Sequence, residues 1–151
     1  MRAPFQVLIL PYRFTDEGLK FGVFRRSDGE VYQFVSGGGE DDETPLAAAK
    51  RELFEETGIR VNTLIELKSI AYIPTNVYAA SHRANWPKDL YVLPEHSFAF
   101  ECNAEPALSD EHLGYEWLIF DDAWEKLTYD SNRTAMHEIK CILEHKDARE
   151  D

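Results

Sequence analysis

Residues 37–59 read GGGEDDETPLAAAKRELFEETGI: three glycines, an acidic stretch and then a run of residues that favour a helix. Thr44 can cap the free N–H groups of that helix, Pro45 suits its first turn, and Gly58 permits a left-handed exit. We therefore predict a helix from Pro45 to Thr57. The apolar stripe expected to anchor it to a sheet consists of Leu46, Ala49 and Leu53.

Three glutamates of this helix, Glu52, Glu55 and Glu56, stand at positions i, i+3 and i+4. Their carboxylates should project from one face within a few ångströms of one another. Three like charges there oppose each other and should raise the pKa of at least one carboxyl, whereas bound Mg²⁺ or Mn²⁺ would reverse that preference. Oxygen ligands suit such hard cations. Taken alone, a charge run of this kind is more often a solvated helix face.

The residues around the glutamates favour the metal interpretation. Gly37 is followed after five residues by Glu43, and after seven more by Arg51-Glu52-Leu53-Phe54-Glu55-Glu56-Thr57-Gly58-Ile59. This arrangement resembles the Nudix box at every defining position. The resemblance implies an α/β/α sandwich with a mixed central β-sheet, and hydrolysis of a nucleoside diphosphate linked to another group. It also implies that Glu52, Glu55 and Glu56 hold Mg²⁺ or Mn²⁺ together with the backbone carbonyl of Ser36.

The other box residues have expected structural roles. Glu43 can pair with Arg51 and so fix the helix against the loop before it. Arg51 should orient the carboxylates, and it is not expected to act as the base because a guanidinium does not deprotonate. The glycines, Gly37 and Gly38 among them, should let the chain turn tightly and let the backbone approach metal and phosphate closely.

A second resemblance lies in SDEHLGYEWL at residues 109–118 and LTYDSNR at residues 127–133. These segments are similar to the bacterial dihydroneopterin triphosphate pyrophosphatases, which are also described as dATP pyrophosphohydrolases. The resemblance implies that Glu111 reaches the metal site. The base that activates the attacking water would then be Glu52 or Glu111. An ordinary exposed loop carboxylate remains the alternative for Glu111.

The expected reaction releases pyrophosphate from a nucleoside or pterin triphosphate. Hydrolysis of another conjugate, such as a dinucleoside polyphosphate or a nucleotide sugar, is the alternative, and a binding module without turnover is the remaining one. Arg25 and Arg26 are candidates to hold phosphate, but at most one should reach the site because alternate residues of a strand face opposite ways. Phe34 or Trp86 could stack on the base or pterin ring, although such aromatics are more often part of the core.

The rest of the chain predicts strands and two further helices around this one. We expect residues 73–94 to form a long loop or lid, a short helix to follow Asp121, and a third helix to run from Asn132 to Glu144. The whole chain, residues 1–151, should form one domain. The expected strands are Pro4–Tyr12, Leu19–Phe24, Val31–Val35, Leu64–Tyr72, Ser97–Cys102 and Tyr115–Phe120.

Composition limits the classes of partner. The chain has 151 residues, 44% of them hydrophobic, and 16 basic against 28 acidic residues give a net charge of −12. Such a surface disfavours an extended nucleic-acid partner, while a small anionic substrate remains compatible if metal ions screen the carboxylates. No apolar run reaches the ~20 residues that a membrane span needs. Cys102 and Cys141 suggest neither a zinc site nor a disulfide framework, so we expect a cytoplasmic protein. Both a monomer and a homodimer remain open, and no membrane partner is expected.

Overall fold

The computed structural model describes the backbone of residues 1–150 and the side chains of residues 1–145. Seven strands form one mixed sheet in the order β3-β2-β1-β6-β5, with β4 added beside β1 and β7 beside β2. The strands are β1 (Arg2–Thr15), β2 (Gly18–Arg26), β3 (Tyr32–Gln33), β4 (Val35–Glu40), β5 (Ile65–Pro74), β6 (Val92–Glu101) and β7 (His112–Ile119). The helices are α1 (Pro45–Thr57), the single 3₁₀ turn η1 (Thr75–Val77), α2 (Ala80–Arg83), α3 (Phe120–Lys126) and α4 (Asp130–Glu150).

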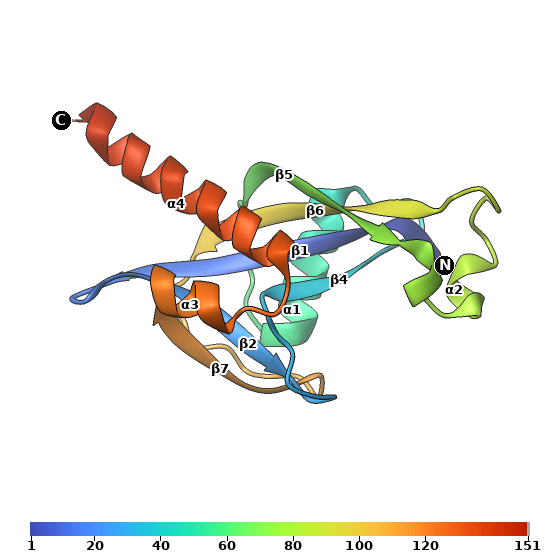
Figure 1. Cartoon of the computed structure of the whole chain (residues 1–151), viewed down its shortest axis with the longest axis horizontal. Coiled ribbons are helices and arrows are strands. Elements are labelled where there is room, and N and C mark those ends of the chain that lie inside the picture. The colour runs from blue at the N-terminus through green and yellow to red at the C-terminus, as the bar shows by residue number, and fades with distance from the viewer. Residues whose placement is uncertain (151) are drawn as a thin grey trace.

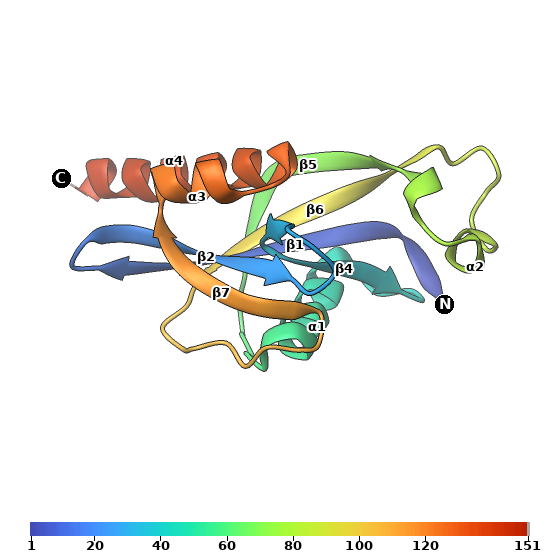
Figure 2. The same cartoon turned by 60° about the horizontal axis from the view of Figure 1, so that its bottom comes forward.

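Helices cover both faces of the sheet. Helix α1 lies against one face, while α3 and α4 lie against the other, as Figures 1 and 2 show. The sequence explains this because apolar residues on β1 alternate between the faces. Val7 and Ile9 pack with Leu53 of α1, whereas Leu8 and Leu10 pack with residues of α3 and α4. The predicted α/β/α sandwich is confirmed.

Helix α1 has the bounds that its capping residues predict. The Thr44 side chain accepts a hydrogen bond from the backbone N–H of Ala47 at 3.1 Å, and Pro45 occupies the first turn. At the other end Gly58 adopts a left-handed φ of 73°, and its N–H donates to the carbonyl oxygen of Phe54. Both ends are therefore fixed by local chemistry.

The expectation for the glycine triplet was wrong in one respect. Residues 37–39 do not turn; they lie inside the extended strand β4, and the predicted strand Val31–Val35 is divided between β3 and β4. The glycines are needed because side chains cross directly over them. A Cβ atom on Gly37, Gly38 or Gly39 would overlap the side chain of Glu52, Arg2 or Phe5, respectively.

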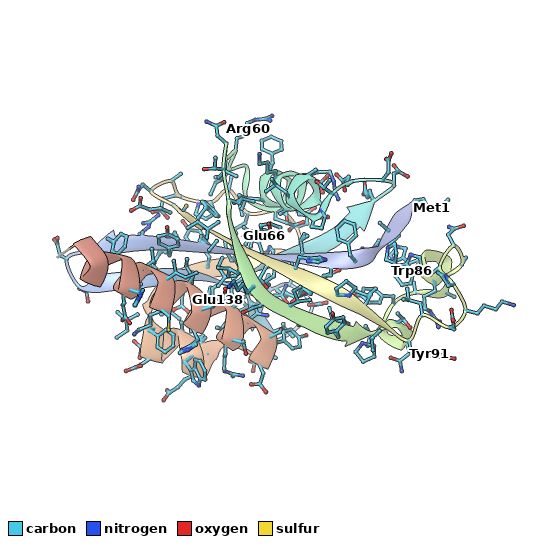
Figure 3. All side chains as sticks on the ribbon, turned by 90° about the horizontal axis from the view of Figure 1, so that it is seen from above. Met1, Arg60, Glu66, Trp86, Tyr91 and Glu138 are labelled. Atoms are coloured by element: carbon cyan, nitrogen blue, oxygen red, sulfur yellow. The ribbon has the colours of Figure 1, made fainter. Side chains whose placement is uncertain are left out.

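Strands β5 and β6 extend into the segment predicted to be a loop. Only residues 75–91 lie between them, and that connection contains η1 and α2. The register of β5 against β6 shifts between Glu66 and Ile70. The carboxylate of Glu138, on α4, accepts hydrogen bonds from the backbone N–H groups of Lys68 and Ser69 at 2.7 and 2.8 Å within this irregular stretch (Figure 3). An α4 side chain thus joins the helix to the sheet where strand pairing is interrupted.

Helix α4 begins two residues earlier and extends six residues further than predicted, to Glu150, and Asp151 lies outside the described residues. Across the described part of the chain, we find no helix with the length and apolar character that crossing a bilayer requires.

Candidate active site

Arg51 is the centre of an ion-pair network at the exposed side of α1. Its guanidinium donates two hydrogen bonds of 2.9 Å to the carboxylate of Glu43 and one of 2.8 Å to the carbonyl oxygen of Gly38. The same group donates to Glu52 at 3.0 Å and to Glu55 at 3.2 Å. Arg51 therefore fixes α1 to β4 and neutralises part of the acidic cluster, and the Glu43 pairing is the one that the sequence spacing predicts.

Glu52 is held in a confined position over the backbone of β4. Its carboxyl group lies directly above Gly37, where any other residue would place a Cβ atom. Only 13% of its side chain is exposed. Burial raises the pKa of Glu52 to about 7, although the nearby Arg51 guanidinium opposes the shift. The structure thus desolvates one carboxyl of the cluster strongly.

Glu56 is buried in a separate group of polar side chains. Its carboxylate accepts a hydrogen bond of 2.6 Å from the hydroxyl of Ser109. Burial raises the pKa of Glu56, and the neighbouring carboxyl of Glu111 raises it further. The Nδ1 atom of buried His112 lies 3.4 Å from Glu56, and burial lowers the pKa of that imidazole, which favours its neutral form. The carboxyl group of Glu111 therefore lies next to that of Glu56, on the helix that carries the Nudix-like motif.

Two of the three box glutamates share a partner, since one nitrogen of Arg51 donates to both Glu52 and Glu55, whereas Glu56 is bonded to Ser109. Glu52 turns toward Gly37, Glu56 turns toward Ser109, and Glu55 remains half exposed beside Arg51. Among the residues that the structure describes, no three acidic, histidine or cysteine side chains stand close enough to form a ready metal-ligand group. The donor chemistry nevertheless fits a hard divalent cation, because carboxyl oxygens are the ligands that such ions prefer. Burial raises the pKa values of Glu52 and Glu56, and a bound cation would favour the charged form of both carboxyls.

A cavity of about 550 Å³ lies on the face of β4 that is opposite α1. Ser36 lines it from β4, and Arg26 lines it from the end of β2. Among the described strands β4 is hydrogen-bonded to β1 alone, so no strand covers its outer edge. Glu111 lies beside the end of β2, because its backbone carbonyl oxygen accepts a hydrogen bond from the N–H of Ser27. Its carboxylate also raises the pKa of Arg26, although Asp28 raises it more.

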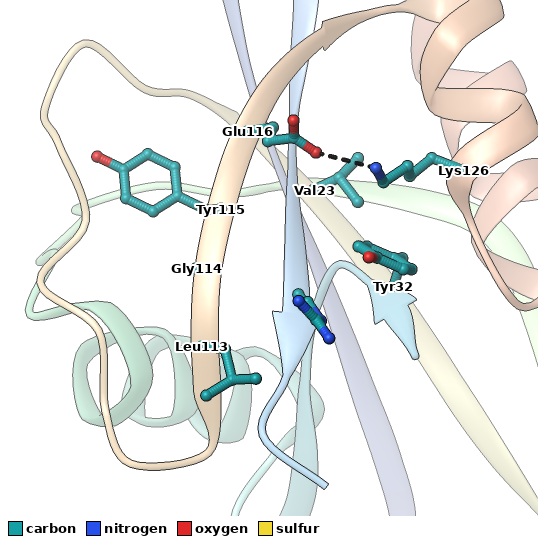
Figure 4. A pocket seen from close by; sticks show the side chains of 8 residues that line it. Val23, Tyr32, Leu113, Gly114, Tyr115, Glu116 and Lys126 are labelled. Atoms are coloured by element: carbon teal, nitrogen blue, oxygen red, sulfur yellow. Dashed lines mark ion pairs between the residues drawn. The ribbon is translucent and has the colours of Figure 1, made fainter. Parts of the chain in front are cut away.

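The two candidate phosphate-binding arginines lie in different cavities. Arg26 forms an ion pair with Asp28 at 3.1 Å in the 550 Å³ cavity. Arg25 lines a second cavity of about 310 Å³ between β2, β3, β7 and α3 (Figure 4). There the carboxylate of Glu116 faces the Nζ atom of Lys126 at 3.4 Å. The alternation along β2 thus separates the two arginines.

Neither aromatic candidate lines the 550 Å³ cavity. Phe34 is fully buried in the core with α4, and its backbone N–H donates to the side chain of Asn132 at 2.9 Å. Trp86 is 7% exposed and lies near the N-terminus (Figure 3), with its indole N–H donating to the carbonyl oxygen of Arg2. The Trp86 ring instead packs edge-on against Tyr78, which does line the cavity.

Sequence reasoning missed Arg2, Ser109 and His112. The guanidinium of Arg2 crosses Gly38, and its environment includes both Glu52 and Tyr78. No pattern in the sequence marks Arg2 as a site residue, because its place over Gly38 depends on the pairing of β1 with β4. Ser109 and His112 flank the Asp-Glu pair that nominated Glu111, so that segment held a signal for them.

Comparisons with known proteins agree with these features. The family model described as NUDIX domain matches residues 6–139. A Listeria monocytogenes protein described as a NUDIX hydrolase is 39% identical over 96% of this chain and 97% of its own, with a TM-score of 0.83. The E. coli dihydroneopterin triphosphate pyrophosphohydrolase is 26% identical and has a TM-score of 0.70, covering 89% of this chain and 92% of its own.

One curated relative adds a partial match. The RNA pyrophosphohydrolase of Bartonella henselae is 42% identical over 82 residues, which are 44% of this chain and 47% of that protein. The chain thus spans about half the length of this curated relative.

Proposed function

The chain belongs to the Nudix family, and on that premise we propose that it is a metal-dependent pyrophosphohydrolase of a nucleoside or pterin triphosphate. One arrangement carries the proposal: α1, on one face of the sheet, holds the buried carboxyls of Glu52 and Glu56, and a cavity large enough for a ring and its side arm lies on the other face of β4. The name of the E. coli relative supports a triphosphate substrate.

Glu52, Glu56 and Glu111, together with the carbonyl oxygen of Ser36, are the groups that would hold Mg²⁺ or Mn²⁺. Glu55 is the further box carboxylate available to it, half exposed beside Arg51. When bound, such an ion supplies charge neutralisation to the phosphate chain and acidifies water. It would also offset the repulsion between Glu56 and Glu111 that raises the pKa of Glu56.

The chain's own residues divide the remaining work. Glu52 or Glu111 would accept the proton of the attacking water. Arg51 holds Glu52 in place, because its guanidinium donates one hydrogen bond to the Glu52 carboxylate and another to the backbone carbonyl oxygen of Gly38. Arg26, at the cavity's edge, would exchange part of its pairing with Asp28 for the phosphate chain. No covalent intermediate is needed, since attack at phosphorus requires chiefly positioning and charge stabilisation.

Pyrophosphate release tests this proposal directly. The purified protein would be incubated with Mg²⁺ and a panel of dATP, dGTP, dihydroneopterin triphosphate, a dinucleoside polyphosphate, a nucleotide sugar and a 5′-triphosphorylated RNA. We expect pyrophosphate from one of the small triphosphates, and none after addition of EDTA. Turnover confined to the dinucleoside polyphosphate or nucleotide sugar would transfer the assignment to that class, and turnover of RNA alone would contradict the small-molecule assignment.

A further inference from the structure

Glu95 is a buried carboxyl for which the fold supplies no partner. It lies on β6, is 6% exposed, and lines the 550 Å³ cavity. Among the described residues, no side chain or backbone N–H donates a hydrogen bond to its carboxylate. A buried acidic group without a protein partner costs free energy, which a ligand that donates hydrogen bonds to it would offset.

The position of Glu95 suits a ligand whose phosphate chain lies at β4 and whose ring lies further into the cavity. Gln6 of β1 pairs with Gly38 of β4 on one side and with Glu95 of β6 on the other. Two steps between neighbouring strands place the backbone of Glu95 roughly 10 Å from that of Gly38. Ser36 and Glu95 both line the cavity, so a ring at Glu95 can extend its side arm toward the β4 edge.

The surroundings of Glu95 are arranged to receive a flat polar ring. Gln6 lines the same cavity, and its amide oxygen accepts a hydrogen bond of 2.7 Å from the guanidinium of Arg2. Tyr78 lines the same end of the cavity, is supported by Trp86, and lies close enough to Glu95 for the two to influence each other's charge. Burial raises the pKa of Glu95 to about 7, and two N–H donors from a ligand would stabilise the ionised form.

We propose that Glu95 determines ring specificity by accepting two hydrogen bonds from the adjacent ring N–H and exocyclic amine of a 2-amino-4-oxo ring, as found in guanine and in pterins. A carboxylate matches that pair of donors because its two oxygens accept side by side. Adenine offers a donor beside an acceptor and cannot satisfy both oxygens. This inference rests on the proposed function and narrows its substrate to guanine or pterin triphosphates.

The test compares Glu95→Gln with the wild type for dGTP, dihydroneopterin triphosphate and dATP. Gln replaces one acceptor by a donor and matches adenine instead. We expect kcat/KM to fall roughly 10- to 100-fold for whichever 2-amino-4-oxo substrate is preferred, with no loss for dATP. Preference between dGTP and the pterin substrate identifies the source of the ring. Glu101→Gln, at the exposed end of the same strand, is the matched control and should leave the ratios unchanged.

Binding of rings without phosphate separates this inference from the proposed hydrolysis. Calorimetric titration of guanosine, 7,8-dihydroneopterin and adenosine should show tighter binding of one of the first two, with the preference lost in Glu95→Gln. That result supports the inference even if no triphosphate is hydrolysed, an outcome that would remove only the proposed function. Equal binding of all three rings, or an equal loss for every substrate in the variant, would overturn it.

Discussion

At position 56 a buried carboxylate is stabilised by one hydrogen bond from Ser109 and opposed by burial and by Glu111, so a bound cation would stabilise its charged form further. We predict that Glu56→Gln lowers kcat by more than roughly 100-fold. Losing a residue that only hydrogen-bonds to a metal ligand typically costs up to about that much, and loss of a ligand itself should cost more. Gln can still accept the hydrogen bond from Ser109, so the melting temperature should hardly change. Steady-state kinetics and thermal unfolding measure both quantities. The exposed Glu66→Gln is the control, and a fully active Glu56→Gln enzyme would contradict the assignment of Glu56 as a ligand.

Glu95 should also give the protein a measurable pH dependence of stability. Its pKa rises from 4.5 in the unfolded chain to about 7 in the fold because burial penalises the charge. The stabilising contribution is therefore complete below pH 4.5 and is lost as the pH rises through 7. The total is about 3 kcal/mol at 1.36 kcal/mol per unit. Of the groups that face it, Tyr78 comes from the β5–β6 connection, and Arg2 acts through Gln6; neither titrates in this range.

The measurement is urea unfolding of the wild type and Glu95→Gln at several pH values without metal. The difference between their unfolding free energies should move in favour of the variant as the pH rises, since Gln carries no charge to desolvate. Subtracting the two curves cancels the other titrating groups. A difference that is constant between pH 4.5 and 7 would show that the fold does not raise the pKa of Glu95.

The sequence predicts those helices and strands whose ends are fixed by nearby residues, and it misplaces those that depend on pairing with a distant strand. Helix α1 was predicted to the residue because Thr44 and Gly58 fix its ends through bonds within the segment itself. Strand β4 was misplaced because residues 37–39 carry no side chains whose alternation could mark a strand. Its extended state comes from pairing with β1, which lies more than twenty-five residues away in sequence. The same dependence on pairing explains why β5 and β6 extend beyond their predicted ends.

The candidate site divides in the same way. The Arg51–Glu43 pair follows from one helix and the residues before it, and the spacing predicts it. The different directions of Glu52 and Glu56 depend on Gly37 and Ser109, which belong to other elements. Glu95 has no local pattern at all, and only the order β4-β1-β6 brings it to one cavity with Ser36.

Strand β4 supports Glu52 only while position 37 has no side chain. We predict that Gly37→Ala lowers kcat/KM by at least about 100-fold, because the added Cβ would overlap the Glu52 carboxyl carbon and displace that group by around an ångström. Gly114→Ala, on β7, is the matched control, since a Cβ atom there meets no atom within 4 Å. Kinetics and circular dichroism would be compared for the two variants. Equal activity of both would contradict the positioning role of β4.

For the molecule as a whole, the charge of −12 makes the acidic cluster dependent on cations. Every phosphate brought to this surface adds to the repulsion, which positive charges from Arg2, Arg26 and Arg51 offset only locally. We therefore predict that divalent cations bind and stabilise the folded chain before substrate arrives. The unfolded chain, whose carboxylates are dispersed, has no comparable site.

Thermal unfolding with and without Mg²⁺ tests this coupling. At a free Mg²⁺ concentration ten times Kd, linkage predicts about 1.4 kcal/mol of added stability, which corresponds to roughly 3–6 °C in Tm. A general screening of the surface charge would produce a similar shift with enough NaCl, so ionic strength must be held constant across the series. The decisive comparison is a double variant, Glu52→Gln with Glu56→Gln, which removes two of 28 acidic residues and leaves the surface strongly negative. Loss of the Mg²⁺ shift in that variant alone assigns the effect to the site, whereas an undiminished shift would assign it to the surface and contradict a metal site on α1.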